Sequence, residues 1–233
     1  MSPLIQQILN DPAAPALAGE LQQALADEAS RRQAFRQWTD ESQKAEFING
    51  EVVLHSPVKK QHLEVSRRLF GLMHFYTSLR GLGVVWAEKA MVSLTRNDYE
   101  PDLCFFPAEQ AAAFTEDQML FPAPAFVAEI LSARTAKIDQ GIKKQDYAAH
   151  GIGEYWIIDP VRQRVEQYLL ALPSDRTYFP PYLHSISDLI ESRTIPGFRI
   201  PVAAMFEEAA NVAALQRILR GDPPAEPEAE YGA

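Results

Sequence analysis

The sequence predicts an α/β domain, and three observations carry this prediction. Residues 126–160 alternate between strand-like and helix-like segments. The pair Asn49-Gly50 lies between two apolar runs within residues 46–54, which is the strongest short signal for a β-hairpin. Residues 63–79 have apolar side chains at helical spacing and end at glycines, which predicts a long amphipathic helix.

The stretch 126–160 predicts a strand, a helix and a second strand. Phe126–Leu131 is a short apolar run that follows two prolines and ends at a serine, as expected for a buried strand. The helix is expected from Thr135 to His150, with Ser132 or Thr135 as cap and Gly151 as the stop signal. Glu154–Ile158 predicts the second strand, closed by an Asp-Pro turn.

The N-terminal segment is predicted to be a helical arm outside the α/β domain. Residues 1–38 are rich in Ala, Gln and Glu, with breaks near Pro12 and Pro15. Leu17, Leu21 and Leu25 recur at helical spacing, so we expect the arm to pack on the domain or on a partner subunit.

The other expected elements complete the domain organisation. The sequence predicts further strands at 84–86, 91–95, 103–106 and 164–170, a short exposed strand at 195–200 and an amphipathic helix at 202–219. The last residues are too rich in proline and acidic side chains to pack. The expected organisation is a helical extension at 1–44, one domain at 45–220 and a disordered tail at 221–233.

Composition restricts the class of protein. With 233 residues, 47% of them hydrophobic, the chain is expected to form a globular core. Its single cysteine, Cys104, excludes an intrachain disulfide and lies in an apolar run typical of a buried, inert thiol. Without a secretory signal or a membrane-spanning segment, the protein is expected in the cytoplasm with no membrane partner. The net charge of −9 argues against coating nucleic acid by bulk electrostatics, although a local basic groove is compatible with it.

Two acidic residues lie where apolar side chains are expected. Glu129 shares a strand face with Val127 and Leu131, and a carboxylate there costs several kcal/mol unless a cation or metal compensates it. Asp102 opens the apolar run that follows Pro101. Two carboxylates on neighbouring strands are suited to share one Mg²⁺ that also binds a phosphate, and Lys143 on the following helix is within reach of the same place.

Each of these residues also has a structural interpretation. Asp102 is suited to capping a local turn, and Glu129 to pairing with Arg134 or Lys137. Lys143 is suited to an exposed helix pair with Asp139 worth a few tenths of a kcal/mol. The position of Glu129 inside an apolar strand favours the functional interpretation.

A set of motifs resembles a known family. It comprises Asn-Gly-Glu at 49–51, His62, Pro-Asp at 101–102, Ala-Glu-Ile-Leu-Ser at 128–132, the ladder Asp139, Lys143, Tyr147 and Gly151, and Glu-Tyr-Trp-Ile-Ile-Asp-Pro at 154–160. Together they resemble the Uma-two family of proposed restriction endonucleases, in the PD-(D/E)xK nuclease superfamily. The resemblance covers about residues 45–205.

The resemblance implies a restriction-endonuclease-like mixed central sheet flanked by helices and phosphodiester cleavage that depends on Mg²⁺, with Mn²⁺ as an alternative metal. It implies that Asp102 and Glu129 are metal ligands. The sequence departs from the superfamily at Leu131, where a catalytic lysine usually stands two positions after the glutamate. Lys143 on the following helix is therefore the candidate lysine, and Lys144 points about 100° away from it.

Other residues receive supporting roles. Glu51 is a candidate third carboxylate of the site or a surface residue, and His62 is a candidate contact to water or phosphate or a solvent-facing side chain. Asp139 and Tyr147 are expected to orient Lys143. Tyr155 and Trp156 are interpreted as packing, and six basic residues are candidate contacts to a DNA backbone: Lys59, Lys60, Arg67, Arg68, Arg134 and Lys137.

The sequence therefore predicts a metal-dependent endonuclease with DNA as its substrate, and a homodimer as one way to cut both strands. Two alternatives stay open: a non-catalytic module that uses the nuclease fold to bind protein or nucleic acid, and a hydrolase of another phosphoester. A non-catalytic module is expected to tolerate Glu129→Gln, because the change removes a buried charge. It is also expected to show no rise in melting temperature with metal.

Overall fold

The computed structural model describes residues 1–39, 44–172 and 174–222, so most of the predicted tail lies outside the described residues. The chain forms two compact units, Met1–His55 with Thr95–Tyr99 and Ser56–Leu94 with Glu100–Ala233. The predicted boundary at residue 44 stays a prediction, since the first unit contains the N-terminal helices together with a small group of strands. Each unit is described by itself.

The smaller unit combines two helices with a hairpin and a short third strand. Its elements are α1 (Pro3–Leu9), α2 (Ala14–Trp38), β1 (Ala45–Ile48), β2 (Glu51–Leu54) and β5 (Asp98–Tyr99). Strands β1 and β2 pair antiparallel around Asn49 and Gly50, whose φ angles of 50° and 85° are those of a type I′ turn. The predicted hairpin is confirmed.

The end of α2 is fixed within this unit by an aromatic contact and by ion pairs. The ring of Phe35 packs 5.7 Å from that of Phe47 in β1. Arg32 and Arg36 both bind the buried carboxylate of Asp98 in β5, at 2.6 and 2.8 Å. The three leucines of the predicted arm face solvent in this chain, with Leu21 53% exposed.

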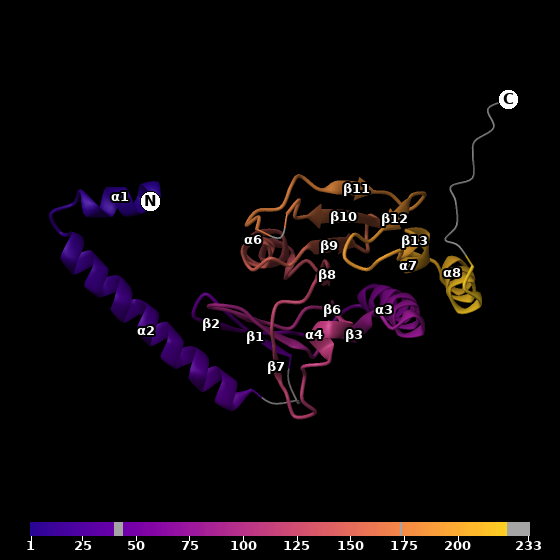
Figure 1. The fold of residues 1–233 in the computed structure, drawn as a ribbon, viewed down its shortest axis with the longest axis horizontal. Coiled ribbons are helices and arrows are strands. Elements are labelled where there is room, and N and C mark those ends of the chain that lie inside the picture. Colours follow the sequence, from indigo (N-terminus) through magenta and orange to yellow (C-terminus); the bar gives the residue numbers. More distant parts are fainter. Residues whose placement is uncertain (40–43, 173, 223–233) are drawn as a thin grey trace. The chain divides into compact units, whose positions relative to one another are not determined.

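The larger unit is built on a six-stranded sheet in the order β11-β10-β9-β8-β6-β3 (Figure 1). Its strands are β3 (Gly83–Ala87), β6 (Leu103–Pro107), β8 (Phe126–Ile130), β9 (Glu154–Asp159), β10 (Arg164–Leu169) and β11 (Tyr182–His184). The pair β8 and β9 is parallel and the other pairs are antiparallel, so the predicted mixed sheet is confirmed.

One face of this sheet carries the main hydrophobic core. Alternate strand residues such as Phe126, Ala128 and Trp156 point into it. They pack under α3 (Lys60–Arg80), α7 (Ala203–Phe206) and α8 (Glu208–Arg220). The long amphipathic helix predicted at 63–79 is confirmed as α3, since its apolar residues Val65, Leu69, Leu72 and Met73 are all buried.

The segment that joins β8 to β9 contains a π-helical turn. It runs through α5 (Ala136–Ile138), the π turn η1 (Asp139–Lys143) and α6 (Lys144–Ala149), and it ends at Gly151 with φ 75°. A parallel pair of strands requires such a crossover. The predicted strand, helix and strand are confirmed, whereas the π turn is a departure from the predicted regular helix.

Short elements complete the larger unit. These are β4 (Met91–Ser93), α4 (Ala108–Ala111), β7 (Leu120–Phe121), β12 (Leu189–Glu191) and β13 (Arg199–Pro201). The predicted exposed strand at 195–200 is wrong in two respects. Residues 195–198 form a turn before the short strand β13, and Ile195 and Ile200 are buried in the core. The predicted helix at 202–219 is divided by the extended backbone of Glu207. Among the described residues, every helix is too short or too polar to cross a membrane.

Candidate active site

Asp102 immediately precedes β6, and Glu129 lies in β8, the antiparallel neighbour of β6. Leu103 of β6 pairs with Ala128 of β8, so the next position outward places Asp102 across from Glu129. Side chains directly opposite in an antiparallel pair point to the same face, with Cβ atoms about 4.5–5.5 Å apart. The main-chain N–H of Ile130, one residue after Glu129, donates to the Asp102 carboxylate, so the two acidic residues predicted to act together lie at the same end of the two strands.

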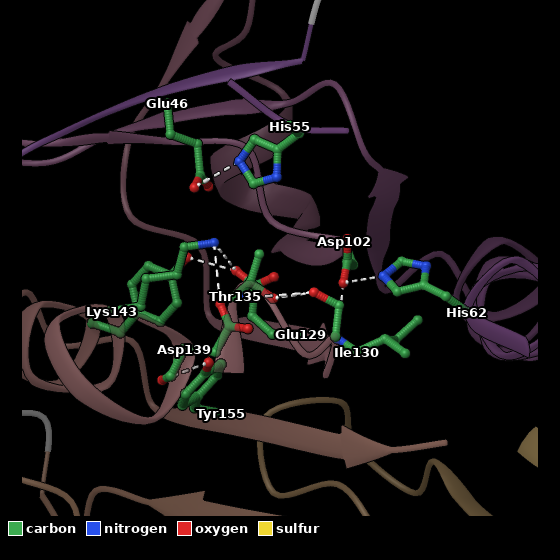
Figure 2. A network of polar contacts seen from close by, with 12 residues as sticks. Glu46, His55, His62, Asp102, Glu129, Ile130, Thr135, Asp139, Lys143 and Tyr155 are labelled. Carbon is green, nitrogen blue, oxygen red and sulfur yellow. Dashed lines mark hydrogen bonds and ion pairs between the residues drawn. The ribbon is translucent and has the colours of Figure 1, made fainter. Parts of the chain in front are cut away.

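Asp102 is held by a main-chain group and by a histidine (Figure 2). Its Oδ2 accepts a hydrogen bond of 2.8 Å from the N–H of Ile130 and lies 3.0 Å from Nε2 of His62. Since an ionised carboxylate only accepts hydrogen bonds, His62 donates from Nε2. His62 is 6% exposed at the start of α3, so the expectation of a solvent-facing histidine is wrong.

Glu129 accepts two hydrogen bonds from the π turn and the helix that follows it. Its Oε1 lies 2.9 Å from Nζ of Lys143 (Figure 2). The same oxygen lies 3.0 Å from the hydroxyl of Tyr147. Glu129 and Lys143 are 3% and 2% exposed. The sequence alternatives for Glu129, a pair with Arg134 or Lys137, are replaced by this buried contact.

Lys143 lies between two carboxylates. In addition to Glu129, Oδ1 of Asp139 lies 3.5 Å from its Nζ. The predicted stripe of Asp139, Lys143 and Tyr147 thus faces Glu129 from one side of the helical segment. Lys144 points elsewhere, with its Nζ 5.0 Å from the ring centre of Tyr168.

Tyr155 is a member of this cluster that the sequence interpretation assigned to packing alone. Its ring does pack, at 5.2 Å from that of Tyr147, and its hydroxyl also donates to the main-chain carbonyl of Asp139 at 3.1 Å. Burial raises the pKa of Tyr155 well above its usual value, and the charges of Glu129 and Asp139 raise it further. A tyrosine beside Trp in an apolar strand gives no sequence signal of such a bond.

The donor set at this site is compatible with a hard divalent cation. The carboxylate oxygens of Asp102 and Glu129 are of the donor type that such an ion prefers. Asp102, Glu129 and Asp139 together with the Lys143 ammonium carry a formal charge of −2. In the part of the chain that the structure describes, no group of three or more His, Cys, Asp or Glu side chains converges as a metal site. Mg²⁺ commonly uses one or two carboxylates and completes its shell with waters and substrate phosphates, so the residues present fit this ion.

Of the remaining predicted residues, Glu51 belongs to the smaller unit and the basic candidates to the larger one. Glu51 is an exposed residue of β2 in the smaller unit. Among the basic candidates, Arg67 and Arg68 are paired with Glu64 and Glu208. The other four are exposed: Lys59, Lys60, Arg134 and Lys137.

Another buried carboxylate, that of Glu154 at the start of β9, was not singled out from the sequence as a candidate. Its Oε1 accepts from Trp156 and Gln167, and its Oε2 accepts from the main-chain N–H groups of Arg193 and Thr194. These bonds tie β9 to the loop after β12. An acidic residue in an apolar strand, the signal that identified Glu129, was present here as well, but the donors around Glu154 indicate a structural role.

Comparison with known proteins supports the same fold. The model of the Uma2 (Uma-two) family, described as "Putative restriction endonuclease", matches residues 32–203. Among solved structures, the chain is similar to a crystal structure of "a putative nuclease belonging to DUF820" from Anabaena variabilis ATCC 29413. The TM-score is 0.64 and the identity 16%, over 78% of this chain and 96% of that chain, which shows the fold alone. No curated protein sequence matches the chain.

Proposed function

Because the chain belongs to the Uma2 family, whose model covers well over half of it, we propose that it is a metal-dependent endonuclease that hydrolyses phosphodiester bonds in DNA. The observation that carries the proposal is the contact of the Lys143 ammonium with Glu129, on the strand next to Asp102. Metal-assisted phosphodiester hydrolysis uses carboxylates to hold the metal ion and a cation to stabilise the charge that develops on the phosphate.

In this proposal Asp102 and Glu129 would hold Mg²⁺ or Mn²⁺. When bound, such an ion supplies Lewis-acid polarisation of a phosphate and lowers the pKa of a coordinated water. The main-chain N–H of Ile130 and the imidazole of His62 fix the orientation of the Asp102 carboxylate.

Lys143 is proposed to orient the attacking water and to stabilise the negative charge that develops on the phosphate as the P–O bond breaks. A buried ammonium is suited to this, since its field is screened less than that of a surface lysine. Asp139 and Tyr147 support the arrangement, the first by its charge beside Nζ and the second by sharing Oε1 of Glu129. The predicted role of Glu51 as a further carboxylate stays a proposal.

DNA is proposed as the substrate on the basis of the family and of exposed cations in the larger unit. Lys59 and Lys60 stand at the start of α3, two to three residues before His62, and Arg134 donates to Ser56 three residues before Lys59. These exposed cations are proposed to contact phosphates of the DNA backbone. A cytoplasmic homodimer that cuts both strands remains part of the proposal, and light scattering of the purified protein tests its size.

Cleavage of plasmid and single-stranded DNA with Mg²⁺ or Mn²⁺ tests the proposed function. Wild type is expected to cut, and Asp102→Asn and Glu129→Gln to be inactive while folded. Lys143→Met is expected to cut about 10²–10³-fold more slowly, the typical cost of removing one charge-stabilising donor. Lys144→Met is the matched control, because its ammonium lies over the Tyr168 ring, and it should retain wild-type activity. Wild-type protein that cuts neither substrate with either metal, or equal rates for Lys143→Met and wild type, would contradict the proposal.

A further inference from the structure

The π turn from Asp139 to Lys143 is the feature that directs Lys143 to Glu129. Single π turns inside α-helices are rare and occur frequently at functional sites. This one ends at Lys143, whose Nζ lies 2.9 Å from Glu129. Relaxation of the turn to an α-helix would rotate the side chain by about one residue position, roughly 100° around the helix axis. The wide turn must therefore be held in place.

Tyr155 contacts the first residue of this turn from the sheet. Its hydroxyl donates a hydrogen bond of 3.1 Å to the carbonyl of Asp139 (Figure 2). Both residues are buried. Tyr155 lies on β9 directly beside Val127 of β8, two residues before Glu129. The hydroxyl thus connects the rigid sheet that carries Glu129 to the helical turn that carries Lys143.

Tyr155 also supports the other donor to Glu129. The rings of Tyr147 and Tyr155 meet edge to face at 81°, with centroids 5.2 Å apart. Tyr147 in turn donates to Oε1 of Glu129. A single side chain therefore contacts both segments from which Glu129 receives its hydrogen bonds.

We propose that Tyr155 is a positioning residue, whose hydroxyl holds the π turn so that the Lys143 ammonium lies against Glu129. The inference goes beyond the proposed function in assigning this role, and it depends on that function only for its catalytic consequence. The predicted requirement is for the hydroxyl and not for the ring, because the ring contact with Tyr147 persists in phenylalanine.

Tyr155→Phe tests the requirement, and Tyr178→Phe is its matched control. Tyr178 belongs to the same group of tyrosine rings, and its hydroxyl also donates to a main-chain carbonyl, that of Ile152 at 2.8 Å. Each variant loses one hydrogen bond from a tyrosine hydroxyl to a main-chain carbonyl. Of the two hydroxyls, that of Tyr155 is the one bonded to the π turn. Both are expected to remain folded, with similar melting temperatures.

Hydrogen exchange of the main-chain amides in residues 139–149 is the first measurement, and it needs no activity. Loss of one buried hydrogen bond is expected to speed local opening by about tenfold in Tyr155→Phe. Tyr178→Phe should exchange like wild type over these residues. Equal protection in wild type and Tyr155→Phe would overturn the proposal, as would equal loss of protection in the two variants.

The second measurement separates turnover from substrate binding. A displacement of about 1 Å costs on the order of a hundredfold in rate, so Tyr155→Phe is expected to lower kcat by about 10–100-fold and to change KM for DNA less than about twofold. An unchanged kcat in an active wild-type background would overturn the catalytic consequence. If wild type does not cleave DNA at all, the proposed function fails, and hydrogen exchange alone decides whether Tyr155 holds the turn.

Discussion

Glu129 shows how the partner of a buried charge determines the effect of a mutation. A carboxylate at 3% exposure is costly in isolation, and its removal would then stabilise the protein. In the structure, however, Lys143 and Tyr147 both donate to its Oε1. Removing one member of a buried ion pair takes from the other charge its nearest partner, here leaving Lys143 with Asp139 at 3.5 Å. Tolerance of Glu129→Gln therefore no longer identifies a non-catalytic module, because the pair contributes to folding in either case.

We predict that Glu129→Gln and Lys143→Met each lower the free energy of unfolding by about 3–5 kcal/mol, the usual cost of breaking a buried pair. The double variant is expected to lose less than the sum of the two, because it removes both charges together. Urea unfolding of the four proteins measures the coupling. If the loss of unfolding free energy in the double variant equals the sum of the two single losses, the contact at 2.9 Å contributes no coupling free energy.

At the scale of elements, Asp159 closes the turn between β9 and β10. Its Oδ1 accepts from the N–H groups of Val161 and Arg162 at 3.0 and 2.9 Å, and its Oδ2 lies 3.1 Å from the Arg162 guanidinium. Burial by itself would raise the pKa of Asp159, but the bonds from Arg162 and Val161 outweigh it and lower the pKa below its usual value of 3.8. The ionised form is therefore the one that stabilises the fold.

This direction of the pKa shift predicts how stability depends on pH. Because the pKa of Asp159 is lower in the folded state, its contribution is fully present above about pH 4 and is lost as the pH falls through the folded pKa. Asp159→Asn is expected to lower the free energy of unfolding by about 1 kcal/mol at pH 7. Below about pH 4 the stability of the variant is expected to fall less steeply with pH than that of wild type. Urea midpoints at pH 7 and pH 3 measure both effects, and an unchanged acid slope in the variant would contradict the prediction.

The elements with strong local signals were predictable from the sequence. The Asn-Gly hairpin, the helix with apolar spacing after residue 60 and the stop at Gly151 each depend on neighbouring residues alone. The π turn and the burial of Ile195 and Ile200 depend on tertiary packing, which local patterns do not encode. The hydrophobic periodicity of a helix does not distinguish a regular turn from a widened one.

A residue of the candidate site could be predicted from the sequence where a charged side chain stands in an apolar stretch. Glu129 was identifiable because a carboxylate in an apolar strand needs compensation. The partners of Asp102 were not, because His62 and Ile130 lie 40 and 28 residues from it in the sequence. Tyr155 lacked any such conflict, since a tyrosine is as suited to packing as to hydrogen bonding.

At the scale of the whole molecule, metal binding should couple to the stability of the larger unit. A ligand present at 100 times its dissociation constant stabilises the folded state by about 2.7 kcal/mol. For chains of about 150–250 residues this corresponds to a rise in melting temperature of roughly 5–10 °C. We predict such a rise on adding Mg²⁺ or Mn²⁺ to wild type.

Asp102→Asn should abolish this rise, because it removes one of the two carboxylates proposed to hold the ion. Lys144→Met should retain it, and KCl at matched ionic strength controls for general screening of charge. Differential scanning calorimetry measures all of these. If wild type shows no rise with either metal, the acid pair binds no ion, and the alternative of a non-catalytic module becomes the better account. If the rise is present in wild type and absent in Asp102→Asn, then Asp102 and Glu129 form a metal site, and the Lys143 ammonium that contacts Glu129 belongs to the same site.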